Sequence, residues 1–249
     1  MRIAYQSSKG RVRDKNEDNV GTFKNASNTI LAVIADGIGG NNAGEIASKM
    51  AVNHIGRKFE KTSFTSPEEL QSWFGYQLES ENSAIIDEAN ADANLYGMGT
   101  TMVAAAVKDY NSLILNIGDS RAYAFHDNKL TQITEDHSYV NELVKHGDIT
   151  KAEAQNNPYK NIITKSLGIN RDATADFRIY NAEIGDQLLL CTDGLTNMVS
   201  DEKIAQTLAL EIPLIDKCNI LVDLANENGG KDNITVLIMQ KDSEVNADE

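Results

Sequence analysis

Three aspartates stand at the ends of short apolar runs in this chain. Asp36 and Asp193 each follow such a run, whereas Asp232 precedes one, and the runs cover residues 30–35, 188–192 and 233–239. Runs of this length, rich in Val, Ile and Leu, are typical of buried strands. If the third strand lies antiparallel to the other two, all three carboxylates reach the same edge of a sheet. Because clustered carboxylates repel one another unless a cation neutralises them, the pattern predicts a metal site.

The length and composition indicate a globular protein. With 249 residues, of which 41% are hydrophobic, the chain can bury a full core. It contains no apolar run near the roughly 20 residues that span a bilayer, and its start lacks the apolar stretch of a secretion signal. Cys191 and Cys218 make no disulfide framework. We therefore expect a cytoplasmic protein, without a membrane partner and monomeric.

The net charge of −14 argues against nucleic acid as the main partner, because phosphate backbones bind basic surfaces. Solubility is the simplest explanation for most of the acidic residues. The acidic tail, residues 242–249, is expected to be solvated surface. Only the acids at strand ends need a different explanation.

The predicted helices frame a central group of strands. Apolar residues recur with helical spacing after Asn42. Ser66, Pro67 and Glu69 mark the start of a second helix, which is predicted to end before Gly97. Strands are predicted at residues 100–107, 113–117, 121–125, 130–133, 177–180 and 187–191. Two further helices, at about residues 201–210 and 214–226, precede the last strand.

The order of these elements predicts an α+β fold. Residues 99–133 contain no crossover helix, so antiparallel sheets fit better than a parallel doubly wound sheet. We predict a four-layer α-β-β-α sandwich with two central, mainly antiparallel sheets. Residues 1–241 are expected to form one domain that includes a flap-like subdomain at about residues 137–171.

Each candidate motif is weak alone, because an Asp-Gly pair most often marks a turn. Taken in order, seven motifs resemble the series found in the PPM, or PP2C-type, metal-dependent serine/threonine protein phosphatases, in particular the short stand-alone bacterial branch. They are RDKNED (13–18), ADGIGG (35–40), GTT (99–101), GDSR (118–121), EDHS (135–138), CTDG (191–194) and DNIT (232–235). The resemblance covers essentially the whole chain.

The resemblance implies two Mn²⁺ or Mg²⁺ ions between the sheets. Asp36 would bridge the two ions, with Asp193 and Asp232 completing one side. The Gly37 carbonyl would hold the second ion, and Glu17 would reach it directly or through water. These oxygen donors suit Mg²⁺ and Mn²⁺, whereas zinc would favour His and Cys.

The resemblance also implies roles for three further residues. Asp18 would orient a coordinated water, and Asp119 matches the position that supports a third, weaker metal together with Asp193. Arg13 matches the arginine that binds the substrate phosphate, for which a planar, bidentate guanidinium is well suited. The implied reaction is direct hydrolysis of phosphoserine or phosphothreonine by a hydroxide shared between the metals.

One position departs from many eukaryotic relatives, which carry a histidine where this chain has Ile38. Leaving-group protonation must then use a metal-bound water or another side chain. His137 is a candidate, but a structural role near a strand end is the stronger interpretation.

Three functions remain open on the sequence alone. The leading hypothesis is a phosphatase of phosphorylated proteins, acting in signal transduction and opposing a serine/threonine kinase. A metal-dependent hydrolase of small phosphate esters would share the same chemistry. A non-catalytic regulator that binds phosphoproteins is the third hypothesis, although such a protein would be expected to have lost some of Asp36, Asp193, Asp232 and Arg13.

Overall fold

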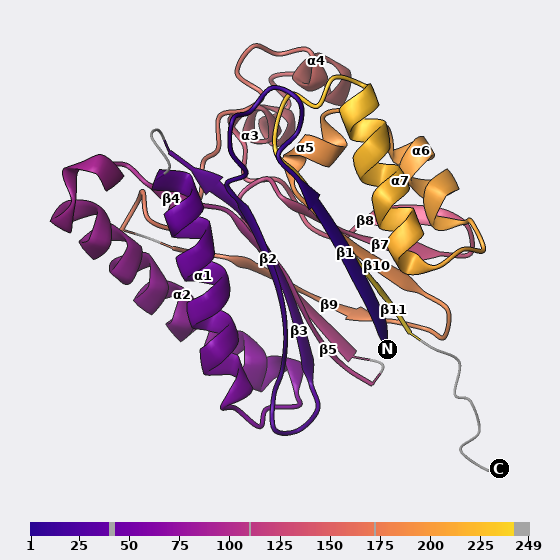
Figure 1. The fold of residues 1–249 in the computed structure, drawn as a ribbon, viewed down its shortest axis with the longest axis horizontal. Coiled ribbons are helices and arrows are strands. Elements are labelled where there is room, and N and C mark those ends of the chain that lie inside the picture. The colour runs from indigo at the N-terminus through magenta and orange to yellow at the C-terminus, as the bar shows by residue number, and fades with distance from the viewer. Residues whose placement is uncertain (40–42, 110, 172, 242–249) are drawn as a thin grey trace.

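The computed structural model describes residues 1–39, 43–109, 111–171 and 173–241. Two antiparallel sheets pack face to face, and helices cover the outer face of each (Figure 1). The predicted four-layer sandwich is therefore confirmed. The acidic tail at 242–249, the end of the ADGIGG motif and Asn42 lie outside the described residues.

One sheet is built around the run that ends near Asp36. Its strand order is β2 (Asp18–Lys24), β3 (Ile30–Ile38), β5 (Met102–Lys108), β6 (Asn111–Ile117) and β9 (Asp176–Asn181), and β4 (Gly99–Thr100) pairs with the end of β3. This pairing carries β3 two residues beyond Asp36, where the sequence predicts a turn. Helices α1 (Ala43–Glu60) and α2 (Pro67–Ala91) cover the sheet, and a short 3-10 helix follows at Ala93–Leu95.

The other sheet carries the last strand of the chain. Its order is β1 (Arg2–Ser8), β11 (Ile234–Gln240), β10 (Gln187–Cys191), β7 (Arg121–His126) and β8 (Lys129–Gln132). Helices α5 (Asp193–Thr196), α6 (Asp201–Leu208) and α7 (Leu214–Glu227) lie against it. Strands β1 and β2 are absent from the predicted elements, because their mixed polar and apolar residues give no continuous apolar run.

Three apolar clusters hold the layers together. One lies between the first sheet and helices α1 and α2, where Phe59 and Phe74 are fully buried. A second joins the other sheet to α6 and α7, and a third fills the space between the sheets with small and branched side chains such as Ala105 and Leu190. Since both faces of the central strands are buried, these strands read as continuous apolar runs in the sequence.

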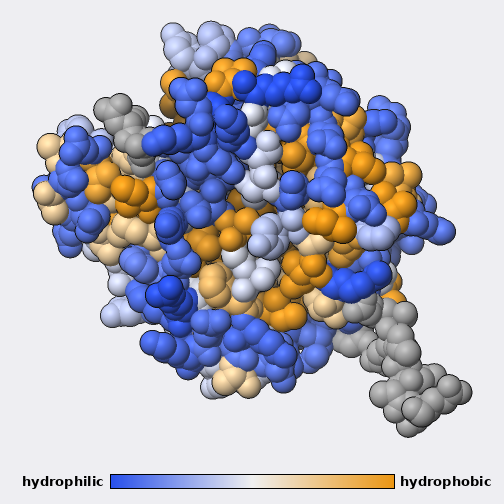
Figure 2. Space-filling model, in the orientation of Figure 1, coloured by the Kyte–Doolittle hydropathy of each residue, from blue (hydrophilic) through white to orange (hydrophobic). Residues whose placement is uncertain are grey.

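The segment between β8 and β9 is less regular than the rest of the described chain. It contains α3 (Tyr139–His146), which ends at the left-handed Gly147, and α4 (Lys151–Gln155), which begins with a capping box at Thr150. Hydrophilic residues cover much of the face shown in Figure 2, in keeping with the acidic composition. Within the described ranges, no helix has both the length and the apolar character needed to cross a membrane.

Candidate active site

The strand ends bring the predicted carboxylates to one end of the sandwich. Asp18 and Asp36 are cross-strand partners in β2 and β3. Strands β10 and β11 are antiparallel, and the amide of Thr192 donates to the carbonyl of Thr235 just beyond the last strand pair. This confirms the expected antiparallel relation for the strands beside Asp193 and Asp232. The carboxylates do not share a single sheet edge, however, because Asp36 belongs to one sheet while Asp193 and Asp232 flank strands of the other.

Asp119 lies on the turn that passes from one sheet to the other. Gly118 and Ser120 flank it, β6 ends in the first sheet before this turn, and β7 begins in the second sheet after it. Gly118 has a φ of +112°, and an added Cβ would lie 2.5 Å from the side chain of Thr101. Only glycine fits here, so the close approach of this turn to Thr101 depends on Gly118.

The side chains around Asp36 repel its negative charge. Burial raises the pKa of Asp36 well above its ordinary value, and four nearby carboxylates raise it further. These neighbours are Asp18, Asp193, Asp119 and Asp232. Burial, opposed in part by hydrogen bonds and reinforced by nearby carboxylates, also raises the pKa of Asp18 to about 7, of Asp193 to about 6 and of Asp119 to about 8. The five carboxyl groups thus share one electrostatic environment.

Asp18 is fixed through one of its two carboxylate oxygens. Its Oδ2 accepts hydrogen bonds from the hydroxyls of Thr192 at 3.0 Å and Thr235 at 2.6 Å. Its buried Oδ1 has no hydrogen-bond partner among the described residues, and neither does the buried Oδ1 of Asp119. Buried oxygens of this kind ordinarily have a partner, so both are open to a bound cation or an ordered water.

The backbone around Asp36 is also held firmly. Its amide donates to the Thr101 hydroxyl at 3.1 Å, and its carbonyl accepts from the Thr100 hydroxyl at 2.8 Å. At the next residue, a Cβ on Gly37 would collide with the backbone of Gly44 in α1. The missing side chain therefore lets β3 approach the start of the helix closely.

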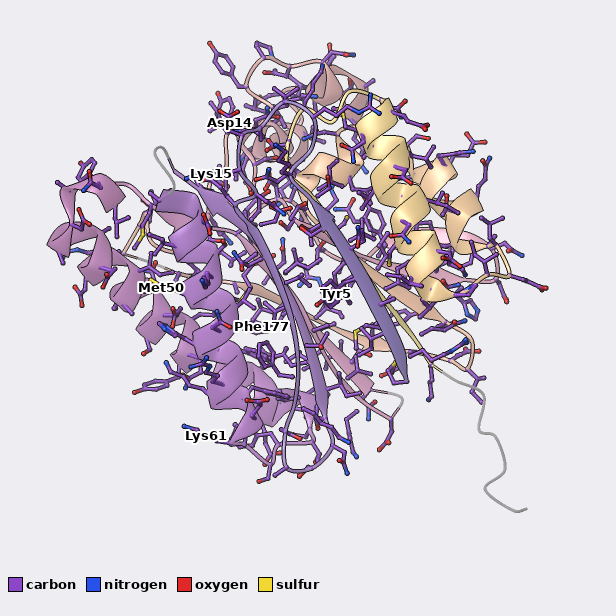
Figure 3. The ribbon with its side chains drawn as sticks, in the orientation of Figure 1. Tyr5, Asp14, Lys15, Met50, Lys61 and Phe177 are labelled. Carbon is purple, nitrogen blue, oxygen red and sulfur yellow. The ribbon has the colours of Figure 1, made fainter. Side chains whose placement is uncertain are left out.

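Arg13 and Glu17 lie beside the carboxylates on the loop between β1 and β2. Arg13 Nη2 donates to Asp232 Oδ2 at 2.8 Å, and the charges of Asp36 and Glu17 also act on Arg13. Burial raises the pKa of Glu17, while Arg13 opposes that shift. Figure 3 labels Asp14 and Lys15 on the same loop, at the end of the sandwich where α5 lies. Arg13 is about half exposed, so it can reach an incoming anion.

The donor set fits a hard divalent cation, but the donors do not form a ready-made cage. Among the described residues, no group of three or more His, Cys, Asp or Glu side chains is gathered closely enough to hold a metal ion. Two carboxylates have other partners, since Arg13 binds Asp232 and Asn197 donates to Asp193 Oδ2 at 2.8 Å. The chemistry still favours Mg²⁺ or Mn²⁺, because the converging donors are oxygens and two of those oxygens are buried without a partner.

Four residues of the site are absent from the predicted set. Thr192 and Thr235 hold Asp18, and Asn197 holds Asp193. Asn233 accepts from the Glu17 amide at 2.8 Å and donates to the carbonyls of Lys9 and Lys15, which anchors the loop carrying Arg13. For Thr192, Asn233 and Thr235 the available signal was a polar residue next to a motif aspartate or inside an apolar strand, whereas Asn197 lies four residues after Asp193 and had no such signal.

His137 has the structural role favoured by its sequence position. It is 2% exposed, and its Nδ1 accepts a hydrogen bond from the Gly118 amide at 3.1 Å. Burial lowers its pKa, and the charge of Lys165 lowers it further. A buried, neutral imidazole bonded to the backbone supports the turn before Asp119 and is poorly placed to protonate a leaving group.

Comparisons with known proteins agree with this geometry. The sequence pattern of the family described as protein phosphatase 2C matches residues 6–227. The serine/threonine phosphatase stp of Listeria monocytogenes is 40% identical over 243 residues, which cover 97% of this chain and 96% of that protein. Protein phosphatase PhpP of Streptococcus pneumoniae is 41% identical over 244 residues, covering 98% and 99% of the two chains.

Solved structures show the same fold. The S. agalactiae serine/threonine phosphatase superposes with a TM-score of 0.94 at 38% identity, covering 97% of this chain and 99% of that one. The catalytic domain of the phosphatase PstP, in complex with two manganese ions, gives a TM-score of 0.82 at 35% identity, covering 95% and 96%. With the fold, the order of its motifs and this clustering of carboxylates all in agreement, the chain belongs to the protein phosphatase 2C family.

Proposed function

We propose that this protein phosphatase hydrolyses phosphoserine and phosphothreonine in proteins, using divalent ions held by the carboxylates between its sheets. The observation that carries the proposal is the gathering of five carboxyl groups that repel one another beside the accessible side chain of Arg13. Buried repulsion of this kind destabilises the fold unless cations offset it. The relatives named as serine/threonine phosphatases, and the PstP complex with manganese, support the substrate class and the metal.

The proposed metal ligands are the predicted ones. Asp36, Asp193 and Asp232 would hold two core ions together with the Gly37 carbonyl and Glu17, and Asp119 with Asp193 would support a third. We propose Mn²⁺ or Mg²⁺ on the basis of the oxygen donors. When bound, such ions supply an activated water and neutralise charge on the phosphate.

The chain's own residues bind and orient the reactants. Arg13 would hold two phosphoryl oxygens, and its release from Asp232 would accompany loading of the site. The unpartnered Oδ1 of Asp18 can accept a hydrogen bond from a water and fix its direction. Cys191 is fully buried and burial raises its pKa to about 12, both of which disfavour it as a nucleophile. Direct transfer of the phosphoryl group to water is therefore the proposed reaction.

The test is a phosphate-release assay on metal-stripped protein. Added Mn²⁺ or Mg²⁺ should restore turnover of phosphoserine and phosphothreonine peptides, with higher kcat/KM than for free phosphoserine. Equal kcat/KM for peptides and free phosphoserine would instead favour a hydrolase of small phosphate esters. Binding of phosphopeptides without turnover, at saturating Mn²⁺, would favour a non-catalytic regulator.

Replacing Arg13 by alanine should weaken substrate binding and leave the metals in place. Loss of a charge-assisted, bidentate contact should lower kcat/KM about 10- to 100-fold, mainly through KM, as measured by steady-state kinetics on a phosphopeptide. Arg11→Ala is the matched control, because Arg11 is exposed on the same loop. Loss of bound Mn²⁺ in the Arg13 variant would contradict the assigned role.

Replacing Asp119 by alanine should separate catalysis from tight metal binding. Asp119 would support only the weaker third ion, so kcat should fall while the affinity for the two core ions changes little. Calorimetric titration with Mn²⁺ and turnover measured side by side would show this split. Asp87→Ala, an exposed aspartate on α2, is the control. An unchanged kcat would remove Asp119 from the mechanism.

The proposal extends to the cellular setting. We place the enzyme in the cytoplasm as a monomer that opposes a serine/threonine kinase, and its two free, buried cysteines are compatible with a reducing compartment. Residues 1–241 would act as one catalytic domain. Residues 137–171 would form a flap beside the site, because His137 ties this segment to the turn that carries Asp119.

A further inference from the structure

A polar cavity lies at the end of the second sheet that is far from the carboxylates. It has a volume of about 500 Å³, within the usual range for small-molecule sites. The side chains of Arg2, Gln187, Lys217 and Gln240 line it, together with the chain that links α6 to α7. Gln187 begins β10 and Asp193 follows its end, which separates the cavity from the catalytic site by about 20 Å along the strand.

Lys217 is the unusual feature of this cavity. It is only 4% exposed, although lysine is rarely buried without an ionic partner. Its ammonium donates to Gln187 Oε1 at 3.0 Å and to the Leu208 carbonyl at 2.5 Å. These bonds explain part of its placement, because a cation at the last carbonyls of α6 is favourable. An ammonium has three N–H donors, however, and the third has no acceptor among the described residues.

The charge of Lys217 is also uncompensated. No described carboxylate forms an ion pair with it, since both of its hydrogen-bond acceptors are neutral. Burial lowers its pKa, and the positive charge of Arg2 lowers it further. Arg2 also lines the cavity, where it donates to Gln240 Oε1 at 2.9 Å. A buried ammonium is costly unless an anion offsets its charge.

We propose that this cavity binds a compact anion bearing phosphate or carboxylate groups. Lys217 would donate its third N–H to the anion and offset the anion's negative charge. Arg2 would add positive charge from the opening of the cavity. The amide side chains of Gln187 and Gln240 would add hydrogen bonds. Glu211 also lines the cavity and is exposed, so its carboxylate disfavours an anion large enough to reach it.

Calorimetric titration of metal-stripped protein with pyrophosphate and with citrate tests this directly. We expect saturable binding of at least one of them, and the two arms distinguish a phosphate ligand from a polycarboxylate. The Arg13→Ala variant should bind the anion with the same affinity as the unaltered protein. This result would show that the anion binds in this cavity and not at the catalytic site. Lys217→Met should weaken binding at least about tenfold, because a charge-assisted hydrogen bond is lost.

Two further variants keep the outcome clear. Lys203→Met removes an exposed lysine from α6 and should leave the affinity unchanged. Arg2→Gln should weaken binding without altering the buried part of the cavity, and it replaces Lys217→Met if that protein does not fold. A crystal soaked with the tighter ligand should show it against Lys217. The proposal is overturned if neither anion binds, or if binding survives the loss of Lys217 but not the loss of Arg13.

Discussion

Replacing Asp193 by asparagine is expected to lower kcat by at least about 100- to 1,000-fold, the usual cost of removing one preorganised charge-stabilising group. Asparagine keeps the shape of the side chain and can still bond to Asn197, but it removes a charge that both the core ions and the third ion would need. Phosphate release from a phosphopeptide at saturating Mn²⁺ measures the loss.

The size of the loss in kcat distinguishes an aspartate that binds metal from an exposed aspartate on the surface. Asp216→Asn changes an exposed aspartate on α7 and should leave turnover unchanged. Circular dichroism of both variants would exclude unfolding as the cause of lost turnover. If Asp193→Asn retained near-normal kcat, the assignment of Asp193 as a metal ligand would be wrong.

Replacing Asp36 by asparagine should stabilise the metal-free protein against unfolding. Burial and the surrounding carboxylates raise the pKa of Asp36 well above its ordinary value, and those of Asp18, Asp119 and Asp193 are raised to about 7, 8 and 6. The folded state therefore holds protons that the unfolded state has already released. The resulting stability is fully present below the ordinary pKa of 3.8 and is lost progressively as pH rises from there through about 6 to 8.

Thermal unfolding across pH 5 to 8.5 measures this dependence. The unaltered metal-free protein should lose stability as pH rises, and Mn²⁺ should restore it most strongly at the alkaline end. At pH 8, Asp36→Asn should raise the Tm of the metal-free protein by at least about 3 °C, because it removes a buried carboxyl group whose pKa is raised well above its ordinary value. A lower Tm at pH 8, or a flat pH profile for the unaltered protein, would show that the carboxylates do not repel one another as inferred.

Much of the fold could be predicted because the strands that matter are buried on both faces. Continuous apolar runs such as Leu188–Cys191 stand out in the sequence, and Ser66 and Thr150 mark helix starts through capping chemistry that acts within a few residues. Strands β1 and β2 were missed because each has a partly exposed, mixed pattern that resembles a loop. Their pairing depends on partners more than 200 and about 15 residues away, such as Gln240 and Ala35.

The site could be predicted only in part, because several of its contacts join residues far apart in the sequence. An aspartate at the end of an apolar run is a local signal, so Asp36, Asp193 and Asp232 were identifiable. That they come from two facing sheets follows from strand order, which no local pattern encodes. The hydroxyls that donate to Asp18 belong to Thr192 and Thr235, which are 174 and 217 residues away in the sequence. The salt bridge between Arg13 and Asp232 spans 219 residues.

The most direct test of the account is the number of Mn²⁺ ions that the protein binds. Equilibrium dialysis of metal-stripped protein, followed by elemental analysis, should find at least two ions per chain, with fewer in Asp193→Asn and an unchanged number in Asp216→Asn. Binding of no Mn²⁺ by the unaltered chain, or the same number in all three proteins, would contradict a catalytic site built from these carboxylates.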